Sequence, residues 1–548
     1  MSVKKNDCIP LTIQSLSNDG NGVGRYENEA VFVPATVPGD EAQVRIVKDC
    51  KTYAFGILEH LDTPSPDRID VDCTVAGPCG GCCFRHLCYE AELAAKKDFV
   101  ASAFTRLGGL DLPIADTLPS PDVDRYRNKA QFPVGKDKTG HCCTGFYANR
   151  THRIVSCEDC KLQPTEFNQI AAFLCEAFDR FGLPPYDETT QKGLIRHIFL
   201  RQGAHSGQIL VCLVGASKKA PAMQSLLKEL CQKFPAVKTV IWNSNTKNTN
   251  VILGQENQVL YGPGYIEDTM CNVPIQLGPM SFYQVNTPAA ELLYRTATQM
   301  AQLKPTDRVL DLYCGMGTIG LSLVNQCKEL IGVEIVPEAI AAAKENAARM
   351  GEDVAQRCRF LCADAGRAAQ QLAQEGLQPD VIMVDPPRKG CDQNTLEAIL
   401  TMSPRTIVMI SCNPVTAARD TKFLAEHGYV PNEVHPVDLF PRTKHVETVV
   451  LLSKLQNAEH HIEVDLNLDE MDLTSAESTA TYGEIQDYVK EHTGLQVSHL
   501  YIAQVKRKNG IIERLNYNLP KSENTKQPQC PLEKEKAITE ALKYFQMI

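Results

Sequence analysis

The chain has 548 residues, a formal net charge of −10 and a hydrophobic fraction of 43%. This length exceeds what one hydrophobic core supports, so we expect several domains, and the acidic balance excludes a uniformly basic nucleic-acid-binding protein. No apolar run reaches about 18 residues and the first residues carry no apolar signal core, so we expect a cytoplasmic protein without a membrane span.

Residues 1–62 are expected to form a small β-barrel of the OB type. Between residues 8 and 61, five short β-rich runs, such as 42–47, alternate with turns that contain Gly or Asn, such as 20–25. Five short strands in about 55 residues are typical of this barrel. The pattern leaves open whether the barrel holds a ligand.

Residues 63–268 are expected to form a β-rich domain that begins with a group of cysteines. Cys73, Cys79 and Cys82 follow a C-x5-C-x2-C spacing with glycines between them, and Cys160 lies far downstream. Without an export signal, the 22 cysteines of the chain are expected to be reduced, and the grouped ones to bind metal. Three grouped thiolates with a remote fourth are typical of an iron–sulfur cluster, although four thiolates also hold zinc.

Two further segments of this domain have a recognisable pattern, one of apolar residues and one of cations. Residues 89–107 have apolar side chains at helical spacing and are followed by two glycines, which predicts a helix that could pack on the catalytic domain. Residues 125–153 contain only one acid, Asp137, against seven cations: Arg125, Arg127, Lys129, Lys136, Lys138, Arg150 and Arg153.

Rings are interleaved with these cations, namely Tyr126, Phe132, His141, Phe146, Tyr147 and His152. Cations can pair with phosphates and aromatic rings can stack on unpaired bases, so this stretch favours contact with structured RNA. The alternative is that this basic stretch is only a solvated face.

Residues 269–455 alternate strands and helices, which predicts an α/β domain with a Rossmann-like sheet. A strand runs into a loop with Gly315 and Gly317, where glycine permits the close approach of a nucleotide. Glu334 ends the next strand at the interval typical of an acid that binds a ribose diol, and Asp364 ends the third strand, placed to accept from an adenine amino group. These features predict binding of S-adenosylmethionine. The alternative is a nicotinamide dinucleotide, although the loop lacks a full G-x-G-x-x-G.

The fourth and fifth strands end in groups that could do chemistry. The fourth ends in Asp385-Pro386-Pro387-Arg388, which lacks the aromatic residue expected after the prolines of an amine methyltransferase. The fifth delivers Cys412 to the same edge of the sheet, where open α/β sheets bind ligands. We expect a helix N-terminus and a nearby Arg to lower the pKa of this thiol. Glu447 would place a carboxylate beside it.

The chain resembles the RNA uracil-C5 methyltransferase family, and most closely its 23S ribosomal-RNA branch with an N-terminal TRAM barrel and a [4Fe–4S] cluster. The likeness covers about residues 8–455. The matching motifs are Ser281-Phe282-Tyr283-Gln284-Val285-Asn286, the Asp311 loop, Asp385-Pro386-Pro387-Arg388, Ser411-Cys412-Asn413-Pro414 and His445-Val446-Glu447-Thr448.

This resemblance implies a role for individual residues. Cys412 would be the nucleophile and Glu447 the base. The residues that would line the donor and uracil sites are Gln284, Tyr313, Glu334 and Asp385. Thr318 and Asp364 stand where the family often has asparagine. The four iron ligands would be Cys73, Cys79, Cys82 and Cys160.

The resemblance further implies a class I methyltransferase that uses S-adenosylmethionine to methylate C5 of a specific uridine in 23S rRNA, with no obligate protein partner. Two alternatives stand beside it: the same reaction on transfer RNA, and a non-catalytic iron–sulfur protein that binds RNA or senses redox state. The retained Cys412 and Glu447 argue against the second. Residues 456–548 lie outside the resemblance and are expected to form a small, mostly helical accessory module with the basic run 506–508.

Overall fold

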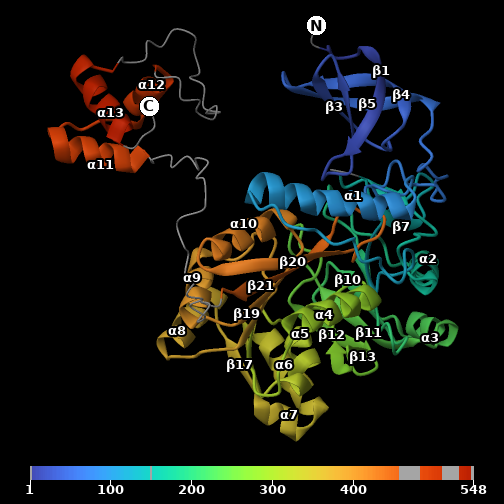
Figure 1. Ribbon diagram of the computed structural model, residues 1–548. Helices are drawn as coiled ribbons and strands as arrows, with labels where there is room; N and C mark the ends of the chain where they lie inside the picture. Colours follow the sequence, from blue (N-terminus) through green and yellow to red (C-terminus); the bar gives the residue numbers. More distant parts are fainter. Residues whose placement is uncertain (1–2, 149–150, 456–481, 509–529, 545–548) are drawn as a thin grey trace. The chain divides into compact units, whose positions relative to one another are not determined.

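The computed structural model describes residues 3–148, 151–455, 482–508 and 530–544. They belong to two compact units, residues 1–457 and 458–548, each of which is described by itself (Figure 1). Within the described ranges, no helix combines the length and the apolar character needed to cross a membrane.

The first unit begins with a closed β-barrel. Its strands are β1 (Cys8–Leu16), β2 (Gly22–Tyr26), β3 (Glu29–Val33), β4 (Glu41–Asp49) and β5 (Tyr53–Thr63). They close in the order β1-β2-β3-β5-β4. Alternate residues of β1, namely Ile9, Leu11 and Ile13, point into the barrel core, as the two-residue period of a strand requires. The predicted small barrel is confirmed.

A seven-stranded sheet follows. Its strands are β6 (Lys129–Lys136), β7 (Cys142–Tyr147), β8 (Ile154–Ser156), β9 (Ile195–Gln202), β10 (Ile209–Gly215), β11 (Val237–Ser244) and β12 (Glu256–Tyr261). Their order is β12-β11-β10-β9-β6-β7-β8. Helices α2 (Thr165–Arg180) and α3 (Gln224–Lys233) share one core with this sheet, around the buried Trp242. A hairpin, β13 (Ile266–Met270) and β14 (Val273–Leu277), leads out of it.

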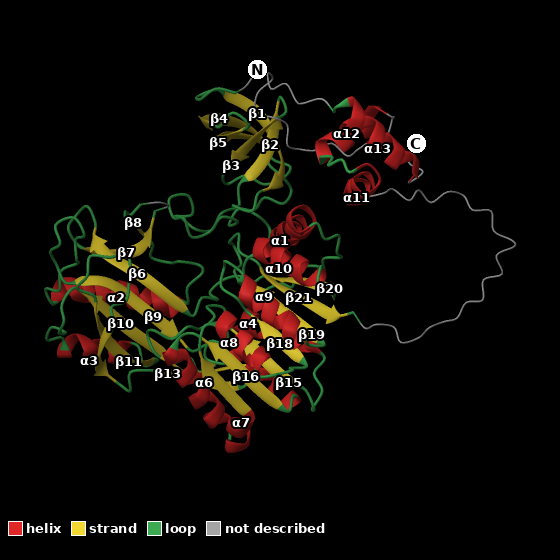
Figure 2. Cartoon of the chain, turned by 90° about the vertical axis from the view of Figure 1, so that its left-hand side faces the viewer, coloured by secondary structure: helices red, strands yellow, loops and turns green. Residues whose placement is uncertain are grey.

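A second seven-stranded sheet carries the predicted methyltransferase motifs (Figure 2). Its strands are β15 (Arg308–Leu312), β16 (Glu329–Glu334), β17 (Cys358–Cys362), β18 (Val381–Val384), β19 (Thr406–Ser411), β20 (Tyr429–Val437) and β21 (Glu447–Lys454). They lie in the order β17-β16-β15-β18-β19-β21-β20. The first five are parallel, and β21 is antiparallel to both of its neighbours. The predicted Rossmann-like fold is confirmed.

Helices cover both faces of this sheet. One face packs on α4 (Thr287–Ala301), α5 (Thr318–Leu323) and α6 (Pro337–Met350), and the other on α8 (Ala365–Gln374), α9 (Gln393–Met402) and α10 (Pro414–Ala425). Adjacent residues of β15 divide between the two cores: Val309 belongs to the first, and Leu310 and Leu312 to the second. A parallel sheet buried on both faces has such uninterrupted apolar strands.

The helix α1 (Tyr89–Ser102) also packs on this sheet. It continues into a π-helical turn (Ala103–Gly108), and Gly109 ends it with a φ of 65°. Val100, Ala103 and Phe104 join the core beneath α8, α9 and α10. The segment between the grouped cysteines and the basic stretch therefore leaves the central region and contacts the methyltransferase sheet.

The second unit is small and helical. Its helices are α11 (Tyr482–Thr493), α12 (His499–Lys508) and α13 (Leu532–Tyr544). Ile485, Ile502 and Ile538 are fully buried in a core that these helices share.

Candidate active site

Three predicted site residues meet at the carboxyl edge of the parallel strands. Asp385 follows β18 and Cys412 follows β19, and these strands are parallel neighbours. Glu447 opens β21, which runs antiparallel to β19 with Ser411 opposite Thr448. The antiparallel return of β21 therefore brings Glu447 to the strand end that carries Cys412.

Burial raises the pKa of both carboxyl groups at this edge. Glu447 is 5% exposed, and burial raises its pKa to about 8, with a further increase from the charge of Asp385 and a partial decrease from Arg388. Burial likewise raises the pKa of Asp385 to about 7. Each group can therefore take up or release a proton near neutral pH.

The expectation that the Cys412 thiol has a lowered pKa is wrong. Its pKa is raised to about 11, mainly by burial and then by the negative charges of Glu447 and Asp385, which outweigh Arg388. The N-terminus of α10 is capped by Asn413, whose side chain accepts from the backbone N–H of Val415 at 3.1 Å. With this pKa the thiol is protonated at neutral pH and needs a base.

The glycine loop after β15 borders open space. Gly315 has a φ of 55°, and a Cβ added there would meet nothing within 4 Å, so the loop borders open space. The backbone N–H of Gly315 donates to Glu334 Oε2 at 3.3 Å. Thr318 opens α5 behind the loop, and Gly317 precedes it with a φ of 80°.

Asp311 lies under this loop. Its Oδ2 accepts from the N–H of Gly320 at 3.0 Å, while its Oδ1 is buried without a partner in the described structure. Burial raises its pKa to about 8. An unpartnered buried oxygen under this loop fits a site whose ligand would supply the missing donor.

Tyr313 directly follows β15, and the charge of Asp364 acts on it. The Tyr313 hydroxyl is 3.4 Å from Thr395 Oγ1, and the charge of Asp364 contributes to the raised pKa of Tyr313, which burial dominates. Asp364 caps α8 by accepting from the N–H of Arg367 at 3.2 Å. Its assignment to an adenine amino group stays a prediction.

Sequence reasoning missed Tyr294, which connects two of the predicted residues. This tyrosine is 2% exposed on α4 and interacts with the side chains of Thr318 and Gln284, and the charge of Asp385 acts on it. In the sequence, Tyr294 lies four residues after Ala290, on the apolar face of the same helix. That signal alone indicates a core residue.

Cations converge at the rim of the site. The pKa of His445 is lowered by burial and then by four cations, namely Arg388, Lys444, Lys96 and Arg127. Arg127 comes from the predicted basic stretch, so part of that stretch lies near Glu447. Lys444 forms an ion pair with Asp19 of the barrel at 2.6 Å.

The first part of the basic stretch departs from the prediction at several residues. Tyr126 and Phe132 are buried core residues, so they present no ring to a base, and this part of the interpretation is wrong. Arg125 is already paired with Asp159 at 2.6 Å, and burial lowers the pKa of Lys129 to about 8. Arg150 lies outside the described residues.

The four predicted iron ligands lie in one neighbourhood. Burial and then the charge of Cys160 raise the pKa of Cys82 to about 12, and Cys79 and Cys73 add to the effect. Cys157 interacts with Cys160 and is the main cause of its lowered pKa, about 7. Across the described residues, no three His, Cys, Asp or Glu side chains are arranged to hold a single metal ion.

Comparisons with known proteins add to this geometry. Residues 88–455 match the family described as tRNA (Uracil-5-)-methyltransferase, and residues 3–58 match the TRAM domain. A protein of Bacillus cereus described as an uncharacterized RNA methyltransferase is 40% identical over 455 residues, which are 83% of this chain and 98% of that protein. One of Clostridium tetani with the same description is 40% identical over 451 residues, 82% of this chain and 97% of that protein.

One solved structure is similar over most of its length. The tRNA (uracil-54, C5)-methyltransferase of Pyrococcus abyssi, in complex with S-adenosyl-L-homocysteine, has a TM-score of 0.65 and 24% identity. The match covers 81% of this chain and 100% of that one, and it concerns the fold.

Proposed function

Because this chain belongs to the tRNA (uracil-5-)-methyltransferase family, we propose that it methylates C5 of a uridine in 23S ribosomal RNA through a covalent bond between Cys412 and C6 of the base. The predicted resemblance to the RNA uracil-C5 methyltransferase family with a TRAM domain is confirmed, and the chain is an RNA methyltransferase that uses S-adenosylmethionine. The meeting of Cys412, Glu447 and Asp385 at one strand edge carries the proposal. A thiol beside two carboxyl groups is what uracil-C5 alkylation needs.

The proposed chemistry starts from the poor nucleophilicity of C5. Attack of the Cys412 sulfur on C6 moves the electron pair of the C5–C6 double bond to C5, which then attacks the methyl group. The bound donor supplies that methyl group as an electrophile. Removal of the C5 proton restores the double bond and expels the Cys412 thiolate.

The proposed reaction removes two protons, and the carboxyl groups of Asp385 and Glu447 can accept them. The thiol proton leaves before methyl transfer and the C5 proton leaves after it. We assign the first to Asp385, since Glu447 must still be ionised when the C5 proton departs. The pKa values of about 7 for Asp385 and about 8 for Glu447 allow either group to exchange a proton near neutral pH.

Residues around the glycine loop would hold the donor. Glu334 would accept from the ribose hydroxyls, and the open space at Gly315 would admit the nucleoside. Gln284 and Thr318, which meet at Tyr294, would border the methyl-transfer site. The target base must leave its stack to reach Cys412, and the exposed Arg388 and the partly exposed Arg127 would hold the phosphates on either side of it.

We further propose a [4Fe–4S] cluster on Cys73, Cys79, Cys82 and Cys160. Support comes from the chemistry of the donor set, four thiols whose charges act on one another. A cube of four irons also separates its ligands more widely than one ion does. The reaction above consumes no electrons, so the cluster would act as a structural clip between two distant parts of the central region.

Transfer RNA is the second candidate substrate. The family description and the Pyrococcus abyssi relative both refer to tRNA. The case for ribosomal RNA depends on resemblance to the branch that combines a TRAM barrel with cluster cysteines.

The deciding experiment is methyl transfer from labelled S-adenosylmethionine to unmodified 23S rRNA and unmodified tRNA in parallel. We expect label in 5-methyluridine of 23S rRNA alone. Label only in tRNA would select the second candidate, and label at an exocyclic amine or a ribose would reject uracil-C5 chemistry.

A further inference from the structure

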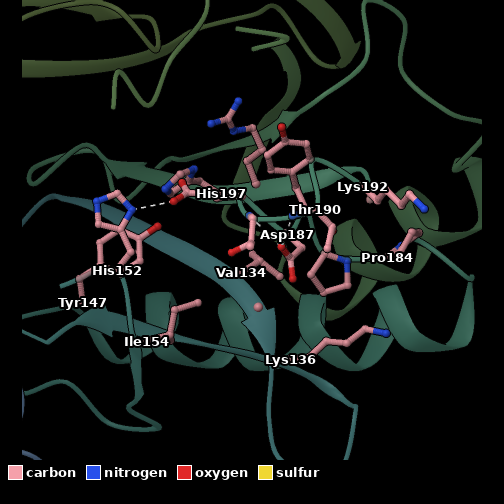
Figure 3. A pocket seen from close by; sticks show the side chains of 17 residues that line it. Val134, Lys136, Tyr147, His152, Ile154, Pro184, Asp187, Thr190, Lys192 and His197 are labelled. Atoms are coloured by element: carbon pink, nitrogen blue, oxygen red, sulfur yellow. Dashed lines mark hydrogen bonds and ion pairs between the residues drawn. The ribbon is translucent and has the colours of Figure 1, made fainter. Parts of the chain in front are cut away.

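A cavity of about 650 Å³ lies in the central sheet, in a part of the chain that the proposed reaction does not use (Figure 3). It is built on β6 and β9 and closed by the segment 184–193. This volume is within the range of sites that enclose a small organic group. The cavity is therefore large enough for one nucleotide.

Ring faces make up part of its lining. Tyr147 is stacked on His152 with ring centroids 5.2 Å apart, and the guanidinium of Arg196 lies over the ring of Tyr186 at 4.7 Å. Arg196 is held there because it donates to the backbone oxygen of Lys247 at 2.7 Å. Such ring and guanidinium planes are the surfaces on which unpaired bases stack.

Both acids of the cavity have hydrogen-bond partners, whereas its two lysines have no carboxylate partner in the described part of the chain. Glu188 pairs with His152 at 2.6 Å. Asp187 Oδ1 accepts from the N–H groups of Thr189 and Thr190, each at 2.8 Å. Lys136 and Lys192 have no carboxylate partner among the residues that the structure describes. Figure 3 shows these two lysines on one side of the cavity and Tyr147 and His152 on the other.

One buried polar side chain in the lining lacks a partner. His197 is 6% exposed, and its Nδ1 makes no hydrogen bond within the described structure. Burial and then Arg196 lower its pKa to about 4, so the ring is neutral at pH 7. A neutral imidazole with an unused nitrogen can donate to or accept from the edge of a base.

We propose that this cavity binds an unpaired nucleotide of the RNA substrate, away from the uridine that is methylated. The rings would stack on its base, His197 would contact a base edge, and Lys136 with Lys192 would hold its phosphates. β6 links the two sites, because it begins two residues after Arg127 at the catalytic rim and ends at Lys136. Its eight residues span about 23 Å, so the second nucleotide would lie several positions from the target. The proposal rests on the proposed function and adds how the enzyme selects its RNA.

The test compares two double variants of the full-length protein that remove the same charge. K136Q/K192Q removes the cavity lysines, and K219Q/K228Q removes two exposed lysines of the same region outside the cavity. Thr189→Trp, at an exposed lining position, fills the cavity without changing charge. The probes are the full-length RNA that the unmodified enzyme methylates and a short hairpin that carries only its target loop.

With full-length RNA, K136Q/K192Q and Thr189→Trp should raise KM about tenfold with kcat unchanged, and K219Q/K228Q should leave KM unchanged. With the short hairpin, all variants should match the unmodified enzyme. For full-length RNA, the slope of log affinity against log salt concentration should become less steep by about 1.4 in K136Q/K192Q. This change corresponds to two lost phosphate contacts. Ultraviolet cross-linking should attach a nucleotide to Tyr147 or Tyr186.

Unchanged KM and salt dependence in both cavity variants would overturn the inference, and the cavity would then be a site for another class of ligand, such as an acidic peptide. An equal loss on the short hairpin would also overturn it, since the effect would lie at the catalytic site. Failure of the unmodified enzyme to methylate uridine would instead reject the proposed function.

Discussion

Cys412 and Glu447 occupy neighbouring strand ends but act at different steps of the proposed reaction, so their variants should fail differently. Cys412→Ala cannot bond C6, and methylation and any covalent complex should both vanish. Glu447→Gln should still attack and transfer the methyl group, because both steps precede removal of the C5 proton. Loss of a general base costs about 10²–10⁴-fold, enough for enzyme bonded to methylated RNA to accumulate. The observable is a protein–RNA band that survives denaturing electrophoresis and carries the methyl label.

RNA containing 5-fluorouridine provides the control, because fluorine cannot leave as a cation and the unmodified enzyme should be trapped in the same way. Normal turnover by Glu447→Gln, or binding of RNA and donor without an adduct, would remove Glu447 from the role of base and direct attention to Asp385.

The buried carboxyl groups also make stability depend on pH. Asp311, Asp385 and Glu447 have folded-state pKa values of about 8, 7 and 8, above the ordinary values of 3.8 and 4.5. A raised pKa means that the folded state binds more protons than the unfolded state. The contribution of these groups to the free energy of unfolding is therefore complete below about pH 4 and is lost as pH rises through 7 to 8. We expect the melting temperature to fall between pH 6 and pH 9 and Glu447→Gln to reduce that fall. Exposed Glu426→Gln should leave it unchanged; equal slopes for both variants would contradict the assignment.

At the scale of elements, a buried ion network joins α1 to the loop that precedes Glu447. Lys96 Nζ donates to Glu92 Oε1 at 2.7 Å and to Asp438 Oδ1 at 2.6 Å, and all three side chains are fully buried. Glu92 Oε1 also accepts from the N–H of Arg442 at 2.7 Å. Since Tyr89 donates to Asp438 Oδ2 at 3.0 Å, α1 holds this loop at several points.

Lys96→Met should destabilise the protein by about 3–5 kcal/mol, because it removes the cation that two buried carboxylates share, and Arg442 lies farther from Glu92, at 3.7 Å. Its neighbour Lys97 is a matched control: it pairs with Asp116 at the surface, and Lys97→Met should cost at most about 1 kcal/mol. Urea unfolding of both variants measures the difference. A Lys96→Met variant as stable as Lys97→Met would mean that the network is dispensable.

The proposed iron–sulfur cluster would connect the segment with Cys73, Cys79 and Cys82 to the segment after β8. Protein purified without oxygen should be brown and hold about four irons per chain. Cys160→Ser should lose the iron, whereas Cys157→Ser should retain it. The reverse result would move the fourth ligand to Cys157, and colourless protein with one zinc would replace the cluster by a zinc site.

For the whole molecule, the division into two units predicts that the first folds alone. Each unit has its own core, and the family match ends at residue 455. A chain that ends at residue 457 should keep its melting temperature within a few degrees and its kcat within about twofold. A chain that ends at residue 446 is the control, because it loses β21, the strand between β19 and β20, and should not fold. A soluble but inactive 1–457 chain would assign a catalytic contribution to the second unit.

The local pattern of the sequence was sufficient for the elements and for the family. Strand periodicity predicts the barrel, and the alternation of strands and helices predicts the parallel sheet, because burial of an apolar face depends on short-range spacing. Cys412 and Glu447 could be identified from the sequence because each lies in a short motif whose residues are neighbours in the chain.

The tertiary structure alone decided which groups act on one another. The thiol of Cys412 has a raised pKa because burial and two carboxyl groups from other strands outweigh Arg388, and spacing along the chain carries no measure of desolvation. Tyr126 and Phe132 look like base-stacking rings beside cations, yet strand pairing turns them into the core. The link from Lys96 to Asp438 and the cavity around His197 join segments that are distant in sequence, so only the folded chain brings them together.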